Sequence, residues 1–385
     1  MLRKSIFALL ALCVVVEFTV LAVSQNKKIS VSDNYLECIT LTKTIEKGKC
    51  IRELAKKAYV QYSAKDISAQ ILSIKDLRKL MFCHEFYHYI GWEIYHRTNS
   101  LPNAFIQTTD MCDNGMIHGI VEAYITNTSR GLTNDAFVSR LPSDICTDSV
   151  NKTILSNGVI GVCYHGLGHG FMLLTNNNID QSLSYCSNLS EGAGGCYTGV
   201  FMEGIQNKQI SLLSHASTPP IFDTTKPDSP CDQLDQRYKK TCYAYKGVFE
   251  TNRTGGDYRK AFFECTKISA PYQNDCFRGV GSNIPGPHWT SEEAGKACSN
   301  ALVVEESAYK DCIEGAMSFI VELHPNSPQE IEKFCQQIQK SDQGFCYEQG
   351  GKNLLHWISD KNLLNNACNT FTTHEARKSC LRSID

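Results

Sequence analysis

The sequence lacks the features of several common protein classes. Lys and Arg together number 38 against 40 Asp and Glu, and no basic tract is present, which argues against a nucleic-acid partner. The chain has no Gly-x-Ser-x-Gly elbow, no Gly-x4-Gly-Lys-Ser/Thr phosphate loop and no Cys-x-x-Cys-His haem attachment motif. Sustained alternation of polar and β-branched residues is also missing, which argues against a β-rich body. The weak strand signals, together with the helical spacing of apolar and aromatic residues from Lys75 to Tyr95, predict an all-α protein.

Long apolar runs are missing too, except at the N-terminus. There Arg3 and Lys4 precede an apolar stretch over residues 5–23, interrupted by Glu17 and Thr19. This pattern is typical of a signal peptide or an uncleaved N-terminal anchor, and we assign residues 1–24 to it. The body is therefore expected outside the cytoplasm, as a secreted, periplasmic or anchored protein that meets the membrane only through this segment.

Cysteine, in contrast, is abundant. Of 19 cysteines one, Cys13, lies in the N-terminal segment, and the even remainder fits disulfides formed in an oxidising compartment. Most fall into close pairs, which we predict to be Cys38 with Cys50, Cys186 with Cys196, Cys231 with Cys242, Cys265 with Cys276, Cys298 with Cys312, Cys335 with Cys346 and Cys368 with Cys380; Cys146 and Cys163 are also expected to be in disulfides. The spacing leaves the disulfide connectivity in the region from Cys83 to Cys163 open, and the pairing of Cys83 and Cys112 above all.

The cysteine pairs recur at a nearly constant period. The first members at 231, 265, 298, 335 and 368 are separated by 34, 33, 37 and 33 residues, the period of a helical hairpin. We predict disulfide-stapled helical-hairpin repeats in an α/α solenoid-like arrangement, each pair joining the end of one helix to the start of the next. A glycine three residues after the second cysteine, as in Cys276-Phe-Arg-Gly, would let helices approach closely. The alternative is a set of unrelated disulfides in a compact globule.

Proline-rich residues 211–230 divide the chain. We predict a helical domain with a metal centre over residues 25–210, a linker loop over 211–230, and Cys-paired helical-hairpin repeats over 231–385. The C-terminal part has histidines only at 288, 324, 356 and 374, without pairing at four-residue spacing. It is expected to be a scaffold or a binding surface.

Potential metal ligands occur in pairs four residues apart, each just after a cysteine. Residues at this spacing share one face of a helix, so each pair can close on one ion; the pairs are His84 and His88, His118 and Glu122, and His165 and His169. A single histidine on an apolar face is usually a core residue with satisfied hydrogen bonds, but five together would leave many buried nitrogens needing partners. We therefore predict a metal-binding helical layer in the N-terminal half.

The predicted disulfides restrict the donor set to imidazole and carboxylate. These donors suit a divalent metal, with zinc favoured and iron or copper as alternatives. Glu203 follows Cys196 much as His169 follows Cys163, and is a candidate for a further carboxylate ligand or a base. The alternative for Glu203 is a solvated helix residue.

The segment His84-Glu85-Phe86-Tyr87-His88 resembles the HExxH motif of zinc metallopeptidases. The resemblance implies His84 and His88 as zinc ligands and Glu85 as the general base that activates water. Gly91 extends it towards the metzincin motif, but position 94, where a third ligand should lie, is Ile94. A third ligand would come from elsewhere, with His118 and Glu203 as candidates. The second histidine pair has glycine in place of Glu85, which favours a joint site of several helices, with one or two ions.

Three functions agree with this sequence. The first is an exported metal-dependent enzyme in which metal-activated water hydrolyses a peptide or a small molecule, with Glu85, Glu122 or Glu203 handling the proton. The second is an iron- or copper-dependent oxidoreductase on the same ligands. The third is a non-enzymatic, disulfide-stapled repeat protein that binds a peptide or a glycan.

Overall fold

The computed structural model describes most of the chain outside its N-terminal segment. The described residues are 28–75, 82–109, 111–112, 114–151, 153, 158–189, 192–206, 221–285, 290–358 and 360–384. Within them the chain forms 20 α-helices and no strand, and 73% of it is helical. The all-α prediction is confirmed, whereas the repeat and solenoid character is not. The predicted signal peptide or anchor and residues 211–220 of the predicted linker lie outside the described residues.

The chain begins with a small group of helices that leads to the histidine-bearing region. They are α2 (Val31–Thr40), α3 (Thr44–Gln61) and α4 (Ala64–Leu72). A capping box starts α4, because the Ser63 hydroxyl accepts from the backbone N–H of Asp66 and the Asp66 carboxylate accepts from the Ser63 N–H. Helix α3 packs against the next long helix, so this group supports one side of the histidine-bearing helices.

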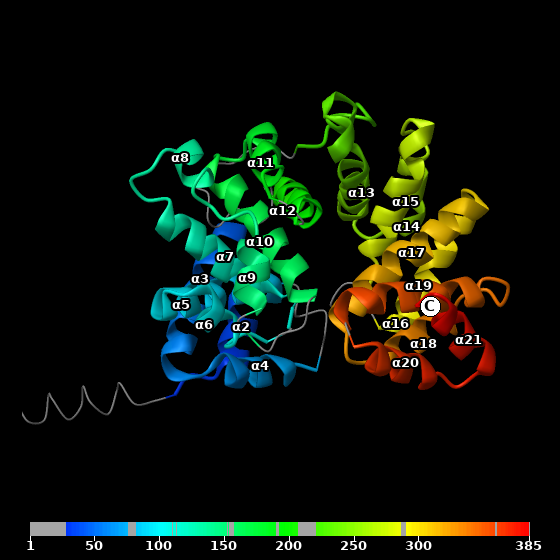
Figure 1. Ribbon diagram of the computed structural model, residues 1–385, viewed down its shortest axis with the longest axis horizontal. Coiled ribbons are helices and arrows are strands. Elements are labelled where there is room, and N and C mark those ends of the chain that lie inside the picture. Colours follow the sequence, from blue (N-terminus) through cyan, green and yellow to red (C-terminus); the bar gives the residue numbers. More distant parts are fainter. Residues whose placement is uncertain are drawn as a thin grey trace, which may run out of the picture.

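Nine helices, most of them long, pack one on the next in chain order. They are α5 (Cys83–Thr98), α7 (Gly115–Thr128), α10 (Gly158–Leu174), α12 (Ala193–Gln206), α13 (Gln236–Arg253), α15 (Gln273–Ser282), α17 (Glu306–Leu323), α19 (Gln343–Trp357) and α21 (His374–Arg382). In Figure 1 the succession runs from the blue and green half of the molecule through α13 to the yellow and red half. We call these nine the inner helices.

Shorter helices connect the inner ones. These are α6 (Leu101–Phe105), α8 (Asn134–Val138), α9 (Ile145–Asn151), α11 (Ile179–Cys186), α14 (Tyr258–Cys265), α16 (Ser291–Cys298), α18 (Pro328–Cys335) and α20 (Lys361–Asn369), with 3₁₀ turns at Cys231–Gln233, Ala270–Tyr272 and Ser299–Val303. Several carry side-chain N-caps from Ser, Thr, Asn or Asp, as at α14, where Asp257 accepts from the Lys260 N–H. They cover the succession of inner helices and complete one continuous apolar core.

Disulfides tie neighbouring segments together: Cys38–Cys50 joins α2 to α3, and the others join connecting segments to inner helices. The structure contains Cys38–Cys50, Cys83–Cys112, Cys146–Cys163, Cys186–Cys196, Cys231–Cys242, Cys265–Cys276, Cys298–Cys312, Cys335–Cys346 and Cys368–Cys380. Cys265 is the last residue of α14 and its partner Cys276 lies in the first turn of α15, as the hairpin prediction requires. The bond between Cys83 and Cys112 joins α5 to the segment before α7. Nine disulfides indicate an oxidising, extracytoplasmic environment.

Glycines bring the inner helices into backbone contact. A Cβ atom at Gly199 would lie 1.9 Å from the carbonyl oxygen of His165, and one at Gly279 would lie 1.7 Å from that of Ala244. These glycines stand three residues after the second cysteine of a pair, so the close approach predicted from the sequence is confirmed. Because only hydrogen fits there, side chains on adjacent inner helices also come close together.

The two halves of the chain also meet away from α13. Gly158, at the start of α10, lies against the indole ring of Trp357 at the end of α19; a Cβ on Gly158 would be 2.1 Å from that ring. This contact brings α19, near the end of the succession, against α10, near its beginning, so residues of both halves face one another. The predicted domain boundaries stay a prediction. Among the described helices none is long and apolar enough to span a membrane.

Candidate metal centre

Five imidazole rings from three adjacent inner helices form one buried cluster. His84 and His88 come from α5, His118 from α7, and His165 and His169 from α10. The centre of the His118 ring lies 5.2 Å from that of His84, 5.3 Å from that of His88, 4.8 Å from that of His165 and 5.2 Å from that of His169. The close approach of the helices, with Gly119 against the carbonyl of His88, places the rings in contact.

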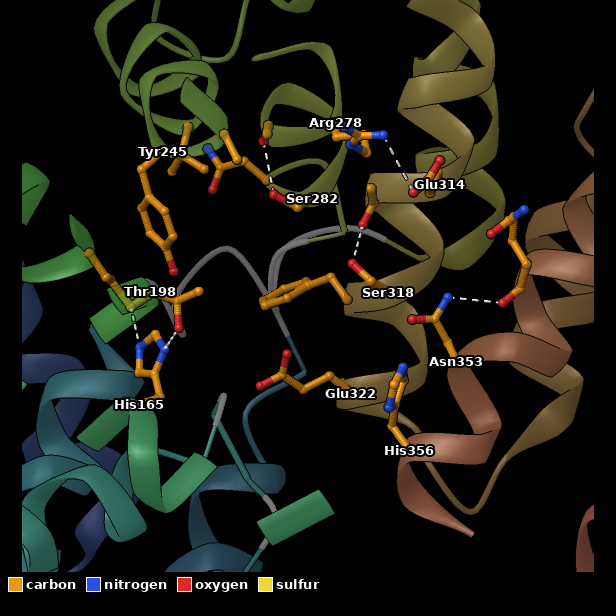
Figure 2. A pocket seen from close by; sticks show the side chains of 18 of the residues that line it. His165, Thr198, Tyr245, Arg278, Ser282, Glu314, Ser318, Glu322, Asn353 and His356 are labelled. Atoms are coloured by element: carbon orange, nitrogen blue, oxygen red, sulfur yellow. Dashed lines mark hydrogen bonds and ion pairs between the residues drawn. The ribbon is translucent and has the colours of Figure 1, made fainter. Parts of the chain in front are cut away.

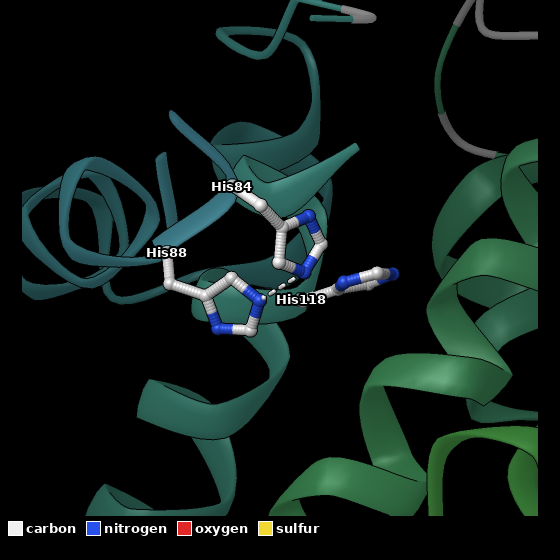
Figure 3. Close-up of side chains that lie close together, drawn as sticks. All are labelled: His84, His88 and His118. Carbon is white, nitrogen blue, oxygen red and sulfur yellow. Dashed lines mark hydrogen bonds between the residues drawn. The ribbon is translucent and has the colours of Figure 1, made fainter. Parts of the chain in front are cut away.

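The cluster contains two overlapping triads suited to a metal ion. Ligand atoms of His84, His88 and His118 lie within 4.8 Å of one another, and so do those of His118, His165 and His169. Figure 3 shows the first triad, with the rings of His84 and His88 turned towards each other and His118 beside them. The five histidines predicted as ligands are therefore brought together, and His118 belongs to both groups.

On α5, the outer nitrogen of each histidine faces an oxygen that can only accept. Nδ1 of His84 lies 2.9 Å from the carbonyl oxygen of Cys112, and Nδ1 of His88 lies 3.1 Å from Oε1 of Glu122. Oε2 of Glu122 accepts from the indole N–H of Trp92 at 3.0 Å. Each Nδ1 must therefore carry the proton and donate, which leaves the inward-facing Nε2 as the metal-binding nitrogen.

The histidines of α10 have the same arrangement. Nδ1 of His169 lies 2.9 Å from Oε2 of Glu203, which makes that nitrogen the donor. Nδ1 of His165 lies 2.7 Å from Oγ1 of Thr198, whose own proton is donated to the carbonyl of Gly195 at 2.6 Å. The Thr198 oxygen therefore accepts from His165. Hydrogen bonds to the outer nitrogen are how metal-binding histidines are held in the correct tautomer and orientation.

These tautomers concentrate nitrogen lone pairs in the interior. Nε2 of His84 and Nε2 of His88 lie 2.9 Å apart, and two lone pairs at that distance repel unless a shared proton or a metal ion lies between them. Nε2 of His169 and Nδ1 of His118 are buried without a hydrogen-bond partner among the described residues. An unpaired buried polar atom costs about 1–3 kcal/mol, so this cluster needs a proton or a metal ion.

The surroundings keep most of these rings neutral. Burial, together with the neighbouring histidines, lowers the pKa of His84, His118 and His165 well below the ordinary value. Burial also opposes the charged form of His88, but the Glu122 carboxylate outweighs it and the net pKa of His88 is raised. The pKa of Glu122 is correspondingly lowered by His88, against the effect of its own burial. Neutral imidazole is the form that binds metals.

The carboxylates predicted as ligands or bases occupy different places. Glu122 and Glu203 lie behind the rings, on the outer nitrogens of His88 and His169. Glu85 is half-buried in the first turn of α5, where its negative charge adds to the effect of burial in raising the pKa of Tyr35. The base role of Glu85 and the direct-ligand roles of Glu122 and Glu203 stay predictions.

Two neighbours of His165 have no counterpart in the sequence prediction. Sδ of Met202 lies 3.2 Å from Nε2 of His165, and Thr198 holds the opposite nitrogen. Both residues follow Cys196, at positions that correspond to His165 and His169 after Cys163. The shared offset from the second cysteine is the pattern that would have found them.

A cavity of about 620 Å³ opens beside the cluster, between the two halves of the chain. His118 and His165 form part of its wall, and Figure 2 shows His165 facing side chains of the C-terminal inner helices. The opposite wall includes Tyr245, Arg278, Ser282, Glu314, Ser318, Glu322, Asn353 and His356. Arg278 and Glu314 again stand two residues after a second cysteine. The C-terminal half thus completes a site that begins in the N-terminal half.

Comparison with known protein families, with curated proteins and with solved structures finds no match to this chain. Its function is therefore inferred from the site alone. The described residues establish buried histidine groups that can hold a metal ion, beside a cavity large enough for a small molecule.

Proposed function

We propose that this protein is an exported, metal-dependent hydrolase whose metal ion or ions are bound by His84, His88, His118, His165 and His169. The observation that carries the proposal is the set of inward-facing lone pairs, above all the two Nε2 atoms of His84 and His88 at 2.9 Å. In tetrahedral zinc sites with Zn–N bonds of about 2.0–2.1 Å, ligand nitrogens lie about 3.3 Å apart. A small movement of two rings would therefore admit the ion.

Glu122 and Glu203 are assigned here to positioning the imidazoles. A carboxylate on the outer nitrogen fixes the tautomer and raises the basicity of the ligand nitrogen. Both oxygens of Glu122 are occupied by His88 and Trp92, which supports this assignment over direct ligation. Glu85 remains the proposed general base, as the HExxH resemblance implies. The metal would supply a bound water of lowered pKa and would polarise a substrate carbonyl.

Zinc is the proposed metal, and one observation favours a second candidate. The cysteine sulfurs are in disulfides, so imidazole is the main donor, and this suits zinc, iron and copper. The thioether of Met202 lies beside Nε2 of His165, and soft sulfur donors select copper. A copper-dependent oxidoreductase on the second triad is therefore the alternative. Export as a secreted, periplasmic or anchored protein is proposed from residues 1–24.

The test is the metal content of the purified, oxidised protein, measured by mass spectrometry after equilibration with zinc, iron and copper salts. The variants are His88→Ala, in the first triad only, and His169→Ala, in the second triad only. His356→Ala is the matched control, because His356 lines the cavity but belongs to neither triad.

Stoichiometric zinc that both triad variants lose and the control keeps would support the proposed centre. Copper or iron in place of zinc would favour the oxidoreductase. A protein that takes up none of the three metals would refute the enzyme proposal and leave a disulfide-stapled binding protein.

A further inference from the structure

The cavity beside the histidine cluster continues past His165. A second cavity of about 470 Å³ lies on the α10 side, and its wall includes Gly158, Gly161, Tyr164, Gly192 and Trp357. Both cavities are lined by His165, Thr198, Glu322 and His356. These shared residues place the candidate metal ligand His165 between two spaces, each of a size that accepts a small molecule. A substrate that extends to both sides of the ligand fits this layout better than a single small molecule.

The larger cavity offers mainly neutral hydrogen-bonding groups. The hydroxyl of Ser282 donates to the carbonyl of Gly279 at 2.9 Å, and that of Ser318 donates to the carbonyl of Gly315 at 2.8 Å. Each hydroxyl proton is thus used within its own helix, and the oxygen lone pairs remain as acceptors. Amide groups of Gln349, Asn353 and Asn283, with the aromatic rings of Tyr245 and Phe319, complete this surface.

The cations of the larger cavity are balanced by neighbouring carboxylates. Arg278 pairs with Asp275 and lies 3.6 Å from both Asp311 and Glu314. Lys352 is paired with Glu348 at 2.8 Å. Because these positive charges already have partners, the cavity is poorly suited to an anion such as a phosphate or a free carboxylate. Its chemistry matches a neutral ligand rich in hydroxyl donors.

The walls of both cavities are formed mainly by helices, and this bears on whether a peptide or a glycan binds there. An extended peptide is commonly recognised through main-chain hydrogen bonds to a strand edge, and the described residues contain no strand. Backbone groups inside a helix already bond within it, so recognition here falls to side chains. Side-chain hydroxyl, amide and carboxylate groups with aromatic rings can bond sugar hydroxyls and cover the apolar faces of sugar rings. These features favour a glycan over a peptide.

We propose that the two cavities form one binding site for a linear, neutral glycan that carries acetyl groups and passes His165. This inference rests on the proposed hydrolase function. Metal-activated water attacks acyl carbons, so the scissile bond is that of an acetyl group. For an acetamido sugar, the water oxygen bonds to the carbonyl carbon, the C–N bond breaks, and a proton passes to the leaving nitrogen. The products are acetate and an amino sugar.

Two glycines allow a matched test. Apart from chain neighbours and the nearby backbone of the same helix, no atom of the described residues lies within 4 Å of a Cβ placed on Gly161 or on Gly194, so there is open space where a side chain would begin at either position. Gly161 lines the second cavity, whereas Gly194 lines neither cavity. Gly161→Leu should therefore obstruct the second cavity without straining the helix, and Gly194→Leu is the control.

Binding would be measured by isothermal titration calorimetry with hexa-N-acetylchitohexaose and N,N′-diacetylchitobiose, called chitohexaose and chitobiose below, and with hexaalanine, and acetate release would be followed with the hexaose. We expect chitohexaose to bind the unaltered protein and Gly194→Leu equally, and to bind Gly161→Leu at least tenfold more weakly. Chitobiose, which is short enough for the larger cavity alone, should bind all three alike. Equal binding of the hexaose to both variants, binding of hexaalanine only, or no binding would overturn the inference.

Metal content of the same samples separates this inference from the proposed function. Suppose that the unaltered protein holds a metal that His88→Ala loses, but does not bind chitohexaose. That result would refute the glycan site and leave the hydrolase proposal standing. Chitohexaose that binds a metal-free protein with the expected response to Gly161→Leu would support the glycan site, while the absence of acetate release would refute the hydrolytic step.

Discussion

Replacing Gly199 by alanine is expected to disrupt both the packing of α12 on α10 and the metal centre. The new Cβ would lie 1.9 Å from the carbonyl oxygen of His165, whereas ordinary contacts begin near 3.4 Å. The two helices must therefore separate by about 1.5 Å, and overpacking of this kind usually costs about 1–3 kcal/mol. Because the displaced backbone carries His165, we also expect weaker metal binding.

Gly194 in the same helix provides the opposite expectation. A methyl group added there would have no atom of the described residues within 4 Å, so Gly194→Ala exchanges glycine for a better helix former and should stabilise by about 0.5–1 kcal/mol. Thermal unfolding followed by circular dichroism, with metal content measured on the same samples, would compare the pair. If Gly199→Ala melted as high as Gly194→Ala and kept its metal, helix contact through glycine would be refuted as the basis of the site.

Four further predictions concern the metal centre and the scaffold. His118→Ala should abolish metal binding at both triads, as metal titration would show, since His118 is common to them. Glu203→Gln should weaken metal affinity about 10–100-fold by removing the charge behind His169, and a competition assay with a chelator would measure this. Burial raises the pKa of Asp311 to about 7 from 3.8, so the stability it contributes is complete below pH 4 and is lost as the pH rises through 7. Asp311→Asn should therefore raise the melting temperature at pH 8 and leave it unchanged at pH 4. Replacing Cys265 and Cys276 together by serine should cost about 3 kcal/mol in chemical unfolding, from the loop entropy that the disulfide removes.

Each of these four predictions has an outcome that would contradict it. Full metal occupancy in His118→Ala would show that the triads do not share a ligand, and unchanged affinity in Glu203→Gln would leave that carboxylate without a positioning role. A melting temperature of Asp311→Asn that followed the unaltered protein at every pH would mean that this carboxyl titrates normally. If the double serine variant unfolded at the same denaturant concentration as the unaltered protein, the Cys265–Cys276 disulfide would not contribute to stability.

Local patterns predicted much of this fold because its main contacts are local. The constant spacing of cysteines such as Cys265 and Cys276 predicted a short turn between helices, and the glycine after the second cysteine predicted their close approach. Histidines four residues apart predicted that His84 would lie beside His88, because the helix alone determines that distance. Each of these predictions needed only the geometry of one hairpin or one helix.

Contacts between distant residues were not predictable in this way. The contact of Glu122 with the outer nitrogen of His88 depends on how α5 and α7 are rotated, which the spacing within α7 does not reveal. The cavity wall from Arg278 to His356 depends on the contact of Trp357 with Gly158, which no local pattern reveals. The residue two positions after the second cysteine repeatedly lines the cavity, as His165, Thr198, Arg278 and Glu314 do. This becomes evident only once the helices are seen side by side.

The packing of inner helices in chain order has a consequence for the way the protein assembles. All five histidines precede residue 170 and Glu203 follows closely, whereas the opposite wall of the cavity begins at Tyr245. A chain that leaves the ribosome or an export channel N-terminus first can therefore complete the histidine cluster before the far wall exists. The nascent histidine cluster would face solvent at that stage, and a metal ion could reach it without a path through the finished molecule. On the proposed function, the later helices would then close over a site that already holds its metal.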